Sequence, residues 1–205
     1  MNLKVISLNF LCIFIVLSSF SQNLTLAIKT NKKEYKVGEK ILSNLAYSVK
    51  DSGVCIFPSG VYNTYFEGDS VRKSTNSLCP FYEVILRVIY IPYEDNFTDT
   101  IYLAGVQSNM CYLGLNKTTI TPNLSYKTYT SDLTSILWDK YDAHSDKLIY
   151  PYSRKNYFSR EGIYEVKANY KAKRIPHYMK QIEISTDLPL FEGSINSNTI
   201  SFEIK

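Results

Sequence analysis

The chain has 205 residues, of which 45% are hydrophobic, and its formal net charge at pH 7 is +4. This length suits one large domain or two small ones, and it can bury a core without disulfide staples. The charge is too small to indicate a polyanionic partner, so we expect no nucleic-acid ligand.

Residues 1–21 have the features of a secretory signal peptide. Lys4 places a positive charge near the N-terminus, residues 5–17 are almost entirely apolar, and small serine residues precede Gln22. The apolar run is shorter than the roughly 20 residues that cross a bilayer, so we expect cleavage before Gln22 rather than a membrane anchor. The mature chain, 22–205, is then exported to the periplasm, the cell surface or the medium, and it contains no transmembrane segment.

Alternating apolar and polar residues predict strands along most of the mature chain. The predicted strands cover residues 24–28, 41–49, 81–91, 101–103, 124–130, 162–170 and 200–204. The segment at 81–91 is the most apolar, which indicates a central strand, and the segment at 162–170 alternates most cleanly. Several strands separated by turn residues, with little helix, predict an all-β sandwich.

Residues 132–142 show a different pattern. Apolar residues recur there at spacings of three and four, and Ser131 and Asp132 can cap a first turn. This spacing predicts one short amphipathic helix. A strand that continues from Thr130 is the alternative.

The middle of the chain is the least regular part. Residues 51–80 are rich in glycine and proline, which break long elements. The mature chain is also much longer than the roughly 100 residues of a minimal sandwich. We therefore expect a single domain over 22–205 with an irregular insertion at about 51–123.

Three cysteines follow the predicted cleavage site: Cys55, Cys79 and Cys111. An exported protein can keep disulfides that a cytosolic one would lose. The odd number permits one bridge and one remaining thiol, with three possible pairings. Cys55 with Cys79 closes the shortest loop, but the spacing does not decide between the pairings.

The densest polar cluster contains Asp142, His144 and Asp146, whose alternate spacing can turn three ligand atoms toward one cation. A calcium loop of the common type requires a glycine directly after Asp146 and a glutamate six residues later. Lys147 and Ser153 occupy those positions. We therefore expect a solvated loop, with no metal and no other cofactor.

Catalytic signatures are missing from the sequence. The only histidines are His144 and His177, and no nucleophile motif accompanies either of them. The sequence therefore predicts no catalytic residues and a protein that is not an enzyme.

A basic segment with tyrosines is the candidate contact surface. Tyr170, Lys173, Arg174 and Tyr178 lie close together in the sequence. Positive charge beside phenol rings suits an anionic glycan or the surface of a cell envelope.

Three segments resemble bacterial extracellular immunoglobulin-like domains. They are LTLAIKTNKKEYKVGEKI at 24–41, EGIYEVKANY at 161–170 and SNTISFEI at 197–204, and they occur in the family's order. The resemblance implies an immunoglobulin-like antiparallel β-sandwich. It also implies that Tyr164 is the tyrosine-corner residue, whose hydroxyl bonds to the backbone just upstream.

These observations favour an exported, non-enzymatic module for binding, adhesion or envelope structure, whose partner is a protein or glycan at the cell envelope. The first alternative is a secreted protease inhibitor, because sandwich inhibitors resemble this chain in its Tyr and Gly-Glu opening. Such an inhibitor would use the loops at 51–80 and 105–123. A small extracellular hydrolase is the second alternative.

Overall fold

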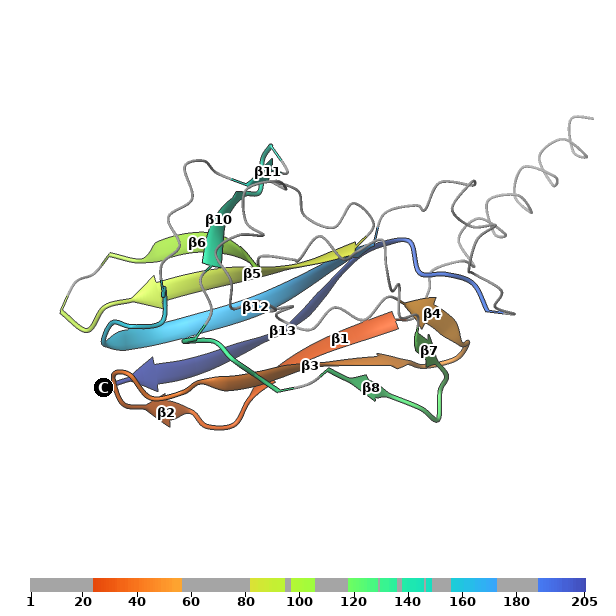
Figure 1. The fold of residues 1–205 in the computed structure, drawn as a ribbon, viewed down its shortest axis with the longest axis horizontal. Coiled ribbons are helices and arrows are strands. Elements are labelled where there is room, and N and C mark those ends of the chain that lie inside the picture. Colours follow the sequence, from red (N-terminus) through yellow and green to blue (C-terminus); the bar gives the residue numbers. More distant parts are fainter. Residues whose placement is uncertain are drawn as a thin grey trace, which may run out of the picture.

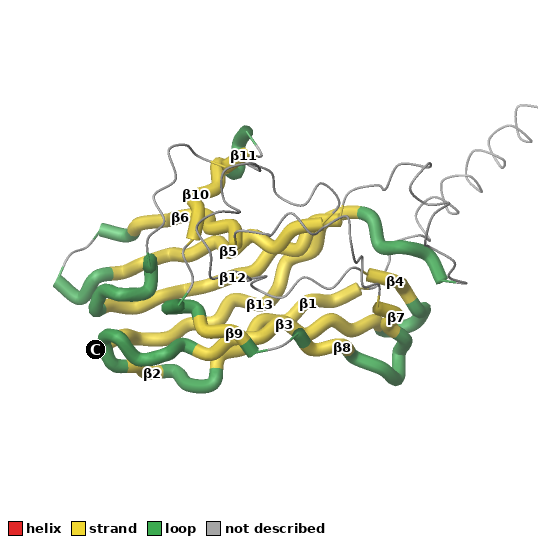
Figure 2. Tube along the Cα trace, viewed as in Figure 1, coloured by secondary structure: helices red, strands yellow, loops and turns green. Residues whose placement is uncertain are grey.

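The computed structural model describes residues 24–56, 82–94, 97–105, 118–128, 130–135, 138–145, 147–148, 156–172 and 188–205. Every regular element in these ranges is a β-strand, and none of the described residues is helical (Figure 2). The prediction of an all-β chain is therefore confirmed. Within the same ranges, no helix is long and apolar enough to cross a membrane.

The strands vary from two to 12 residues in length. They are β1 (Leu24–Thr30), β2 (Glu34–Tyr35), β3 (Leu42–Val49), β4 (Val54–Ile56), β5 (Tyr82–Ile91), β6 (Asp99–Gly105), β7 (Thr118–Ile120), β8 (Tyr126–Lys127), β9 (Ser131–Asp132), β10 (Trp138–Asp142), β11 (Lys147–Leu148), β12 (Gly162–Ala172) and β13 (Gly193–Ile204).

Two large sheets and one small sheet are built from these strands (Figure 1). The larger sheet has the order β11-β10-β6-β5-β12-β13-β2. The smaller one has the order β1-β3-β8, with β9 also paired to β3, and β4 with β7 forms a separate pair. Neighbouring strands are antiparallel except β13 and β2, which are parallel.

Strand β12 shows how the two large sheets come to share a core. Buried and half-buried residues alternate along its whole length, so that Tyr164 and Tyr170 are fully buried while Lys167 is not. The ring of Tyr170 meets the ring of Tyr47 on β3 edge to face, with centroids 5.4 Å apart. Residues of both sheets therefore belong to one hydrophobic cluster.

A side chain of β13 joins the edges of the two sheets. The amide oxygen of Asn198 accepts a hydrogen bond from the backbone N–H of Ile28 on β1 at 2.9 Å, and its amide nitrogen donates to the carbonyl of Ile28 at 3.1 Å. The register of β12 and β13 shifts just here, and the hydroxyl of Ser197 accepts from the N–H of Ala168 at 2.8 Å. Because the shift leaves one extra residue on β13, Asn198 can reach β1.

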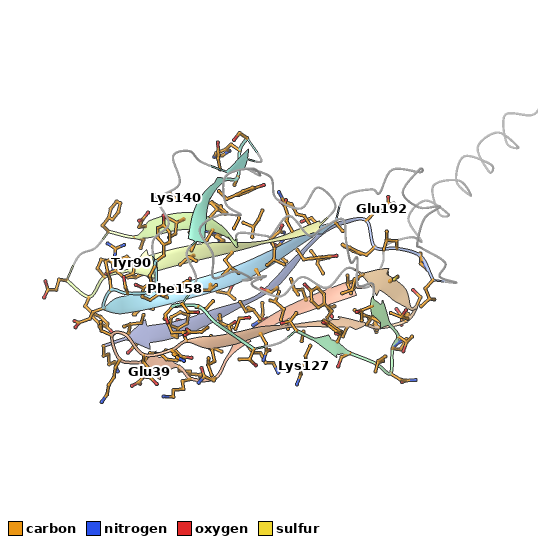
Figure 3. All side chains as sticks on the ribbon, in the orientation of Figure 1. Glu39, Tyr90, Lys127, Lys140, Phe158 and Glu192 are labelled. Atoms are coloured by element: carbon orange, nitrogen blue, oxygen red, sulfur yellow. The ribbon has the colours of Figure 1, made fainter. Side chains whose placement is uncertain are left out.

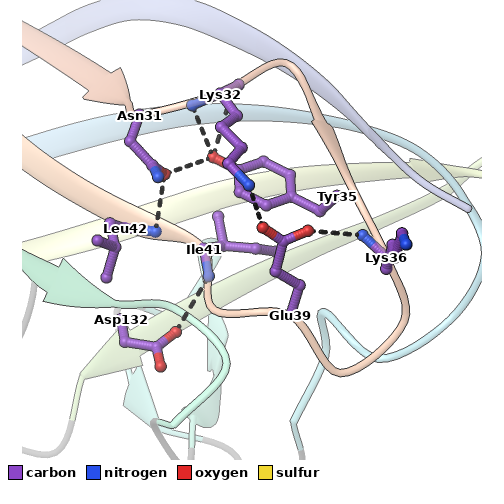
Figure 4. Close-up of polar contacts among 8 residues, drawn as sticks. All are labelled: Asn31, Lys32, Tyr35, Lys36, Glu39, Ile41, Leu42 and Asp132. Carbon is purple, nitrogen blue, oxygen red and sulfur yellow. Dashed lines mark hydrogen bonds and ion pairs between the residues drawn. The ribbon is translucent and has the colours of Figure 1, made fainter.

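The turn between β1 and β3 is closed by side chains of the Tyr and Gly-Glu motif (Figure 4). The hydroxyl of Tyr35 donates to Asn31 at 2.8 Å and accepts from the N–H of Lys32 at 3.0 Å. The same Asn31 oxygen accepts from the N–H of Leu42 at 3.2 Å. Glu39 pairs with Lys32 across the turn. The motif thus satisfies backbone groups that the strands leave open.

The predicted helix at residues 132–142 is wrong. Residues 133–135 form a turn, and Trp138–Asp142 is strand β10, which pairs with β6. The carboxylate of Asp132 does accept the N–H of Thr134 at 3.0 Å, but it also accepts the N–H of Ile41 at 3.2 Å. The predicted cap therefore closes a short turn beside β3, and pairing with β6 overrides the helical spacing.

The range expected to hold an insertion, 51–123, contributes directly to the larger sheet. Strands β5 and β6 lie in its middle, between β10 and β12. The small sheet of β4 and β7 also comes from this range. Residues 57–81 and 106–117 lie outside the described residues, so the range combines core strands with segments that the structure does not describe.

Tyr164 makes the contact that the family resemblance implies. Its hydroxyl donates to the carbonyl of Arg160, four residues upstream, at 2.9 Å and accepts from the Arg160 N–H at 3.3 Å. Its ring stacks on Phe202 of β13, with centroids 5.5 Å apart and an interplanar angle of 10°. Burial raises the pKa of Tyr164 to about 12. The bonds hold the chain entering β12 against the core.

We predict that Tyr164→Phe lowers the free energy of unfolding by about 1 kcal/mol at neutral pH, because the buried hydrogen bond is lost. The folded pKa of Tyr164 lies above the unfolded value of about 10, so its contribution is present below pH 10 and declines as the pH rises toward 12. Urea unfolding should therefore show a shallower loss of stability for the variant than for the wild type between about pH 10 and pH 12. If the unfolding free energies of the variant and the wild type fall equally with pH over this range, Tyr164 is not the group responsible.

Gly162, the first residue of β12, has a backbone conformation and surroundings that only glycine fits. Its φ is +143°, and a Cβ atom there would lie 2.7 Å from both the Ile91 carbonyl oxygen and the Tyr90 ring. We expect Gly162→Ala to cost about 3 kcal/mol or more in urea unfolding, because strain and overlap add. Gly38→Ala is the matched control, since φ is +80° but the space is open. It should cost only about 1 kcal/mol.

Candidate functional site

The candidate site lies on the outer face of the larger sheet, opposite the core. Residues of β12 that alternate with the buried tyrosines point to this face, as do alternate residues of β5 and β13. They surround a cavity of about 370 Å³ that extends from β10 to β13. Its lining consists of Ile85, Arg87, Tyr102, Tyr141, Ala143, Lys167, Asn169, Lys171, Ser194 and Asn196.

The strand register arranges the lining in rows across the sheet. One row runs from Tyr102 on β6 through Arg87 on β5 to Lys167 on β12, because each is the direct partner of the next. In the following row, Asn169 on β12 lies between Ile85 on β5 and Asn196 on β13. Directly opposite residues on one face have Cβ atoms about 5 Å apart, so the side chains of a row are close neighbours.

Lys171 is held in place at one end of the cleft. Its amine donates to the hydroxyl of Tyr141 on β10 at 2.9 Å and lies 5.3 Å from the centre of that ring. It also lies 3.8 Å from the carboxylate of Glu83, its register partner on β5. Glu83 is only 1% exposed, so the lysine charge balances a carboxylate that is almost fully removed from water.

The opposite side of the cleft carries a network of amides and a hydroxyl. The side-chain nitrogen of Asn169 donates to Ser194 at 2.8 Å and to Asn196 at 3.1 Å. These bonds fix the orientation of the three side chains on β12 and β13. Fixed donors and acceptors of this kind recognise ligand hydroxyl groups.

The floor of the cleft is apolar. Ile85, Ala104 and Tyr141 are buried and form a small cluster separate from the main core, with Tyr102 packed against it. This cluster packs side chains of the neighbouring strands β5, β6 and β10 against one another. The cleft therefore combines an apolar floor with phenol rings, cations and amides, which is the usual composition of a small ligand site.

A second cavity of about 410 Å³ lies between β6, β10 and residues 156–160. Its lining includes Asp99, Lys140 and Arg160, and Figure 3 labels Lys140. The guanidinium of Arg160 already lies over the ring of Tyr90, 4.3 Å from its centre. Because charges of both signs line this cavity and one is stacked on a ring, it offers a less distinct ligand preference than the outer-face cleft.

Asp142 and His144 form a turn after β10. The carboxylate of Asp142 accepts the backbone N–H of His144 at 2.9 Å and the hydroxyl of Ser145 at 2.6 Å. The Ser145 bond, followed by the His144 bond, lowers the pKa of Asp142. Asp146 lies outside the described residues, and no group of three or more His, Cys, Asp and Glu side chains within them could hold a metal ion.

The prediction that Tyr170 belongs to an exposed contact surface is wrong. Its side chain is fully buried between Tyr47 and Phe191, because β12 turns every second residue into the core. The other predicted members of that surface, Lys173, Arg174 and Tyr178, lie outside the described residues.

The remaining predicted site residues are divided between the described and undescribed parts of the chain. Cys55 is buried on β4, whereas Cys79 and Cys111 lie outside the described residues, so their pairing stays a prediction. His177 lies outside them as well, as do most residues of the predicted inhibitor loops. His144 is exposed.

No protein-family model matches the chain, and no curated protein matches it.

Sequence reasoning missed the outer-face cleft. The alternation over 162–170 did place Lys167 and Asn169 on the face opposite Tyr164. The register that brings Arg87 and Tyr102 beside Lys167 has no signal in the sequence, because these residues lie on three different strands.

We predict that Lys171→Met destabilises the protein by about 1 to 3 kcal/mol in urea unfolding at neutral pH, because Glu83 loses the cation beside it and Tyr141 loses its donor. Lys167→Met is the matched control, since Lys167 lies two residues away on the same strand and face and no described carboxylate pairs with it. The control should lose no stability. Equal losses in the two variants would show that the ion pair does not matter.

Proposed function

We propose that this protein is an exported, non-enzymatic binding module with an immunoglobulin-like β-sandwich fold, and that its outer-face cleft binds a saccharide of the cell envelope. The observation that carries the proposal is the cleft of about 370 Å³, in which phenol rings, fixed amides and cations surround an apolar floor. A sugar ring has an apolar C–H face and a rim of hydroxyl groups, so it needs both kinds of partner.

Each part of the lining has a role in this proposal. Tyr102 offers a ring face for packing against the sugar ring, since aromatic faces carry partial negative charge that attracts C–H groups. Asn196, held by Asn169, offers amide contacts to hydroxyl groups. The cleft is built on paired strands rather than on loops, which keeps these groups in position before the ligand arrives.

Three features support the immunoglobulin-like part of the proposal. The Tyr35 turn, the Tyr164 hydrogen bond to Arg160 and the pairing of β12 with β13 all occur in the segments that resemble the family. The two large sheets also share one core. The signal-peptide features of residues 1–21 support export.

The test is binding of the purified mature chain, 22–205, to an array of envelope saccharides, followed by calorimetric titration with any saccharide that binds. Tyr102→Ala and Asn196→Ala should each weaken binding about tenfold, because each removes a direct contact. Lys127→Ala is the control, since Lys127 is exposed on β8 of the smaller sheet (Figure 3). It should bind as the wild type does.

If both cleft variants bind the saccharide as tightly as the wild type, the cleft is not the binding site. The absence of binding to any saccharide on the array would reject the function itself.

A further inference from the structure

Two cations lie directly opposite each other in the cleft. Arg87 on β5 and Lys167 on β12 are register partners, and both line the outer-face cavity. Opposite residues on one face of an antiparallel pair are close neighbours, so like charges at these positions destabilise the sheet. A folded chain would gain stability from a neutral residue or a carboxylate at either position.

The structure describes no carboxylate that pairs with either cation. The rest of their row consists of Tyr102 on β6 and Thr199 on β13, which are uncharged. Glu165 lies in the neighbouring row, opposite Ile89 and not opposite a cation. Within the described residues, neither Arg87 nor Lys167 takes part in an ion pair.

Three other described lysines, Lys32, Lys171 and Lys205, have carboxylate partners. Lys205 lies 3.1 Å from Glu34 and 2.9 Å from Glu203, and Lys171 in the cleft itself faces Glu83. The row of Arg87 and Lys167 differs from Lys171 in the same cleft, because it places two cations opposite each other with no carboxylate partner among the described residues.

We infer that the ligand of the cleft is an anionic saccharide, and that its acidic groups bind Arg87 and Lys167. This inference rests on the proposed function, since it names the class of saccharide that the same cleft binds. A carboxylate or sulfate ester between the two side chains supplies the missing negative charge. The guanidinium of Arg87 can bind such a group through two parallel hydrogen bonds, while the amine of Lys167 acts as a point charge.

The surrounding residues favour a sugar over a free anion. Tyr102, directly beside Arg87 in the row, presents a phenol ring, and Asn196 lies one row away with its amide held by Asn169. A small inorganic anion uses neither group. A sugar acid places its charge on the cations and its ring and hydroxyl groups on these neighbours.

The test is calorimetric titration of the mature chain with matched pairs of saccharides at low and high salt. The first pair is tetragalacturonic acid and its methyl ester, which removes the charge and keeps the ring. The second pair is sulfated and unsubstituted maltotetraose. One acidic member should bind at least about tenfold more tightly than its neutral match, and the difference should shrink at high salt. The pair that shows it identifies the acidic group as a carboxylate or a sulfate ester.

Arg87→Gln and Lys167→Gln test the residues. Each should weaken binding of the acidic saccharide about tenfold and leave the neutral match unaffected. Each should also raise the melting temperature of the ligand-free protein by about 1 to 2 °C, because the repulsion disappears. Loss of binding with a gain in stability separates a binding role from a structural one. Lys127→Gln is the control and should change neither.

Equal affinity for the acidic and neutral members of both pairs would overturn the inference and leave the proposed function standing. A lack of binding by all four saccharides and by the saccharide array would reject both. Full binding by Arg87→Gln and Lys167→Gln would show that the acidic groups bind elsewhere.

Discussion

The register of β12 between β5 and β13 is the constraint on which both the core and the cleft depend. Successive side chains of a strand point to opposite faces, so the same segment buries Tyr164 and Tyr170 and exposes Lys167 and Lys171 to the cleft. A slip by one residue would put charges in the core and phenol rings outside. The core and the lining of the cleft are therefore fixed together, through one set of backbone hydrogen bonds.

Local features hold this register at the start and in the middle of the strand. Gly162 allows the close approach of the Ile91 carbonyl where β12 begins, and the Tyr164 hydroxyl fixes the preceding turn. Farther along, the shift between β12 and β13 turns Asn198 toward Ile28. The register that positions the cleft is thus coupled to the contact between the two sheets.

One end of the cleft shows how apolar packing and polar contacts share residues. Tyr141 belongs to the apolar cluster that β5, β6 and β10 share, and its hydroxyl also receives the amine of Lys171. Lys171 in turn balances the buried carboxylate of Glu83. At one end of the cleft the lysine charge is therefore balanced, whereas the row of Arg87 and Lys167 has no balancing carboxylate among the described residues.

The sequence by itself determined the all-β character, the alternation of β12 and the position of Tyr164, because each depends on a period of two or on a short local motif. Only the tertiary structure decided that residues 138–142 pair with β6 instead of forming a helix. The burial of Tyr170 follows from the same alternation that buries Tyr164. The tertiary structure also decided which residues line the cleft. Cross-strand neighbours come from distant segments, and pairing partners leave no periodic trace in a single sequence.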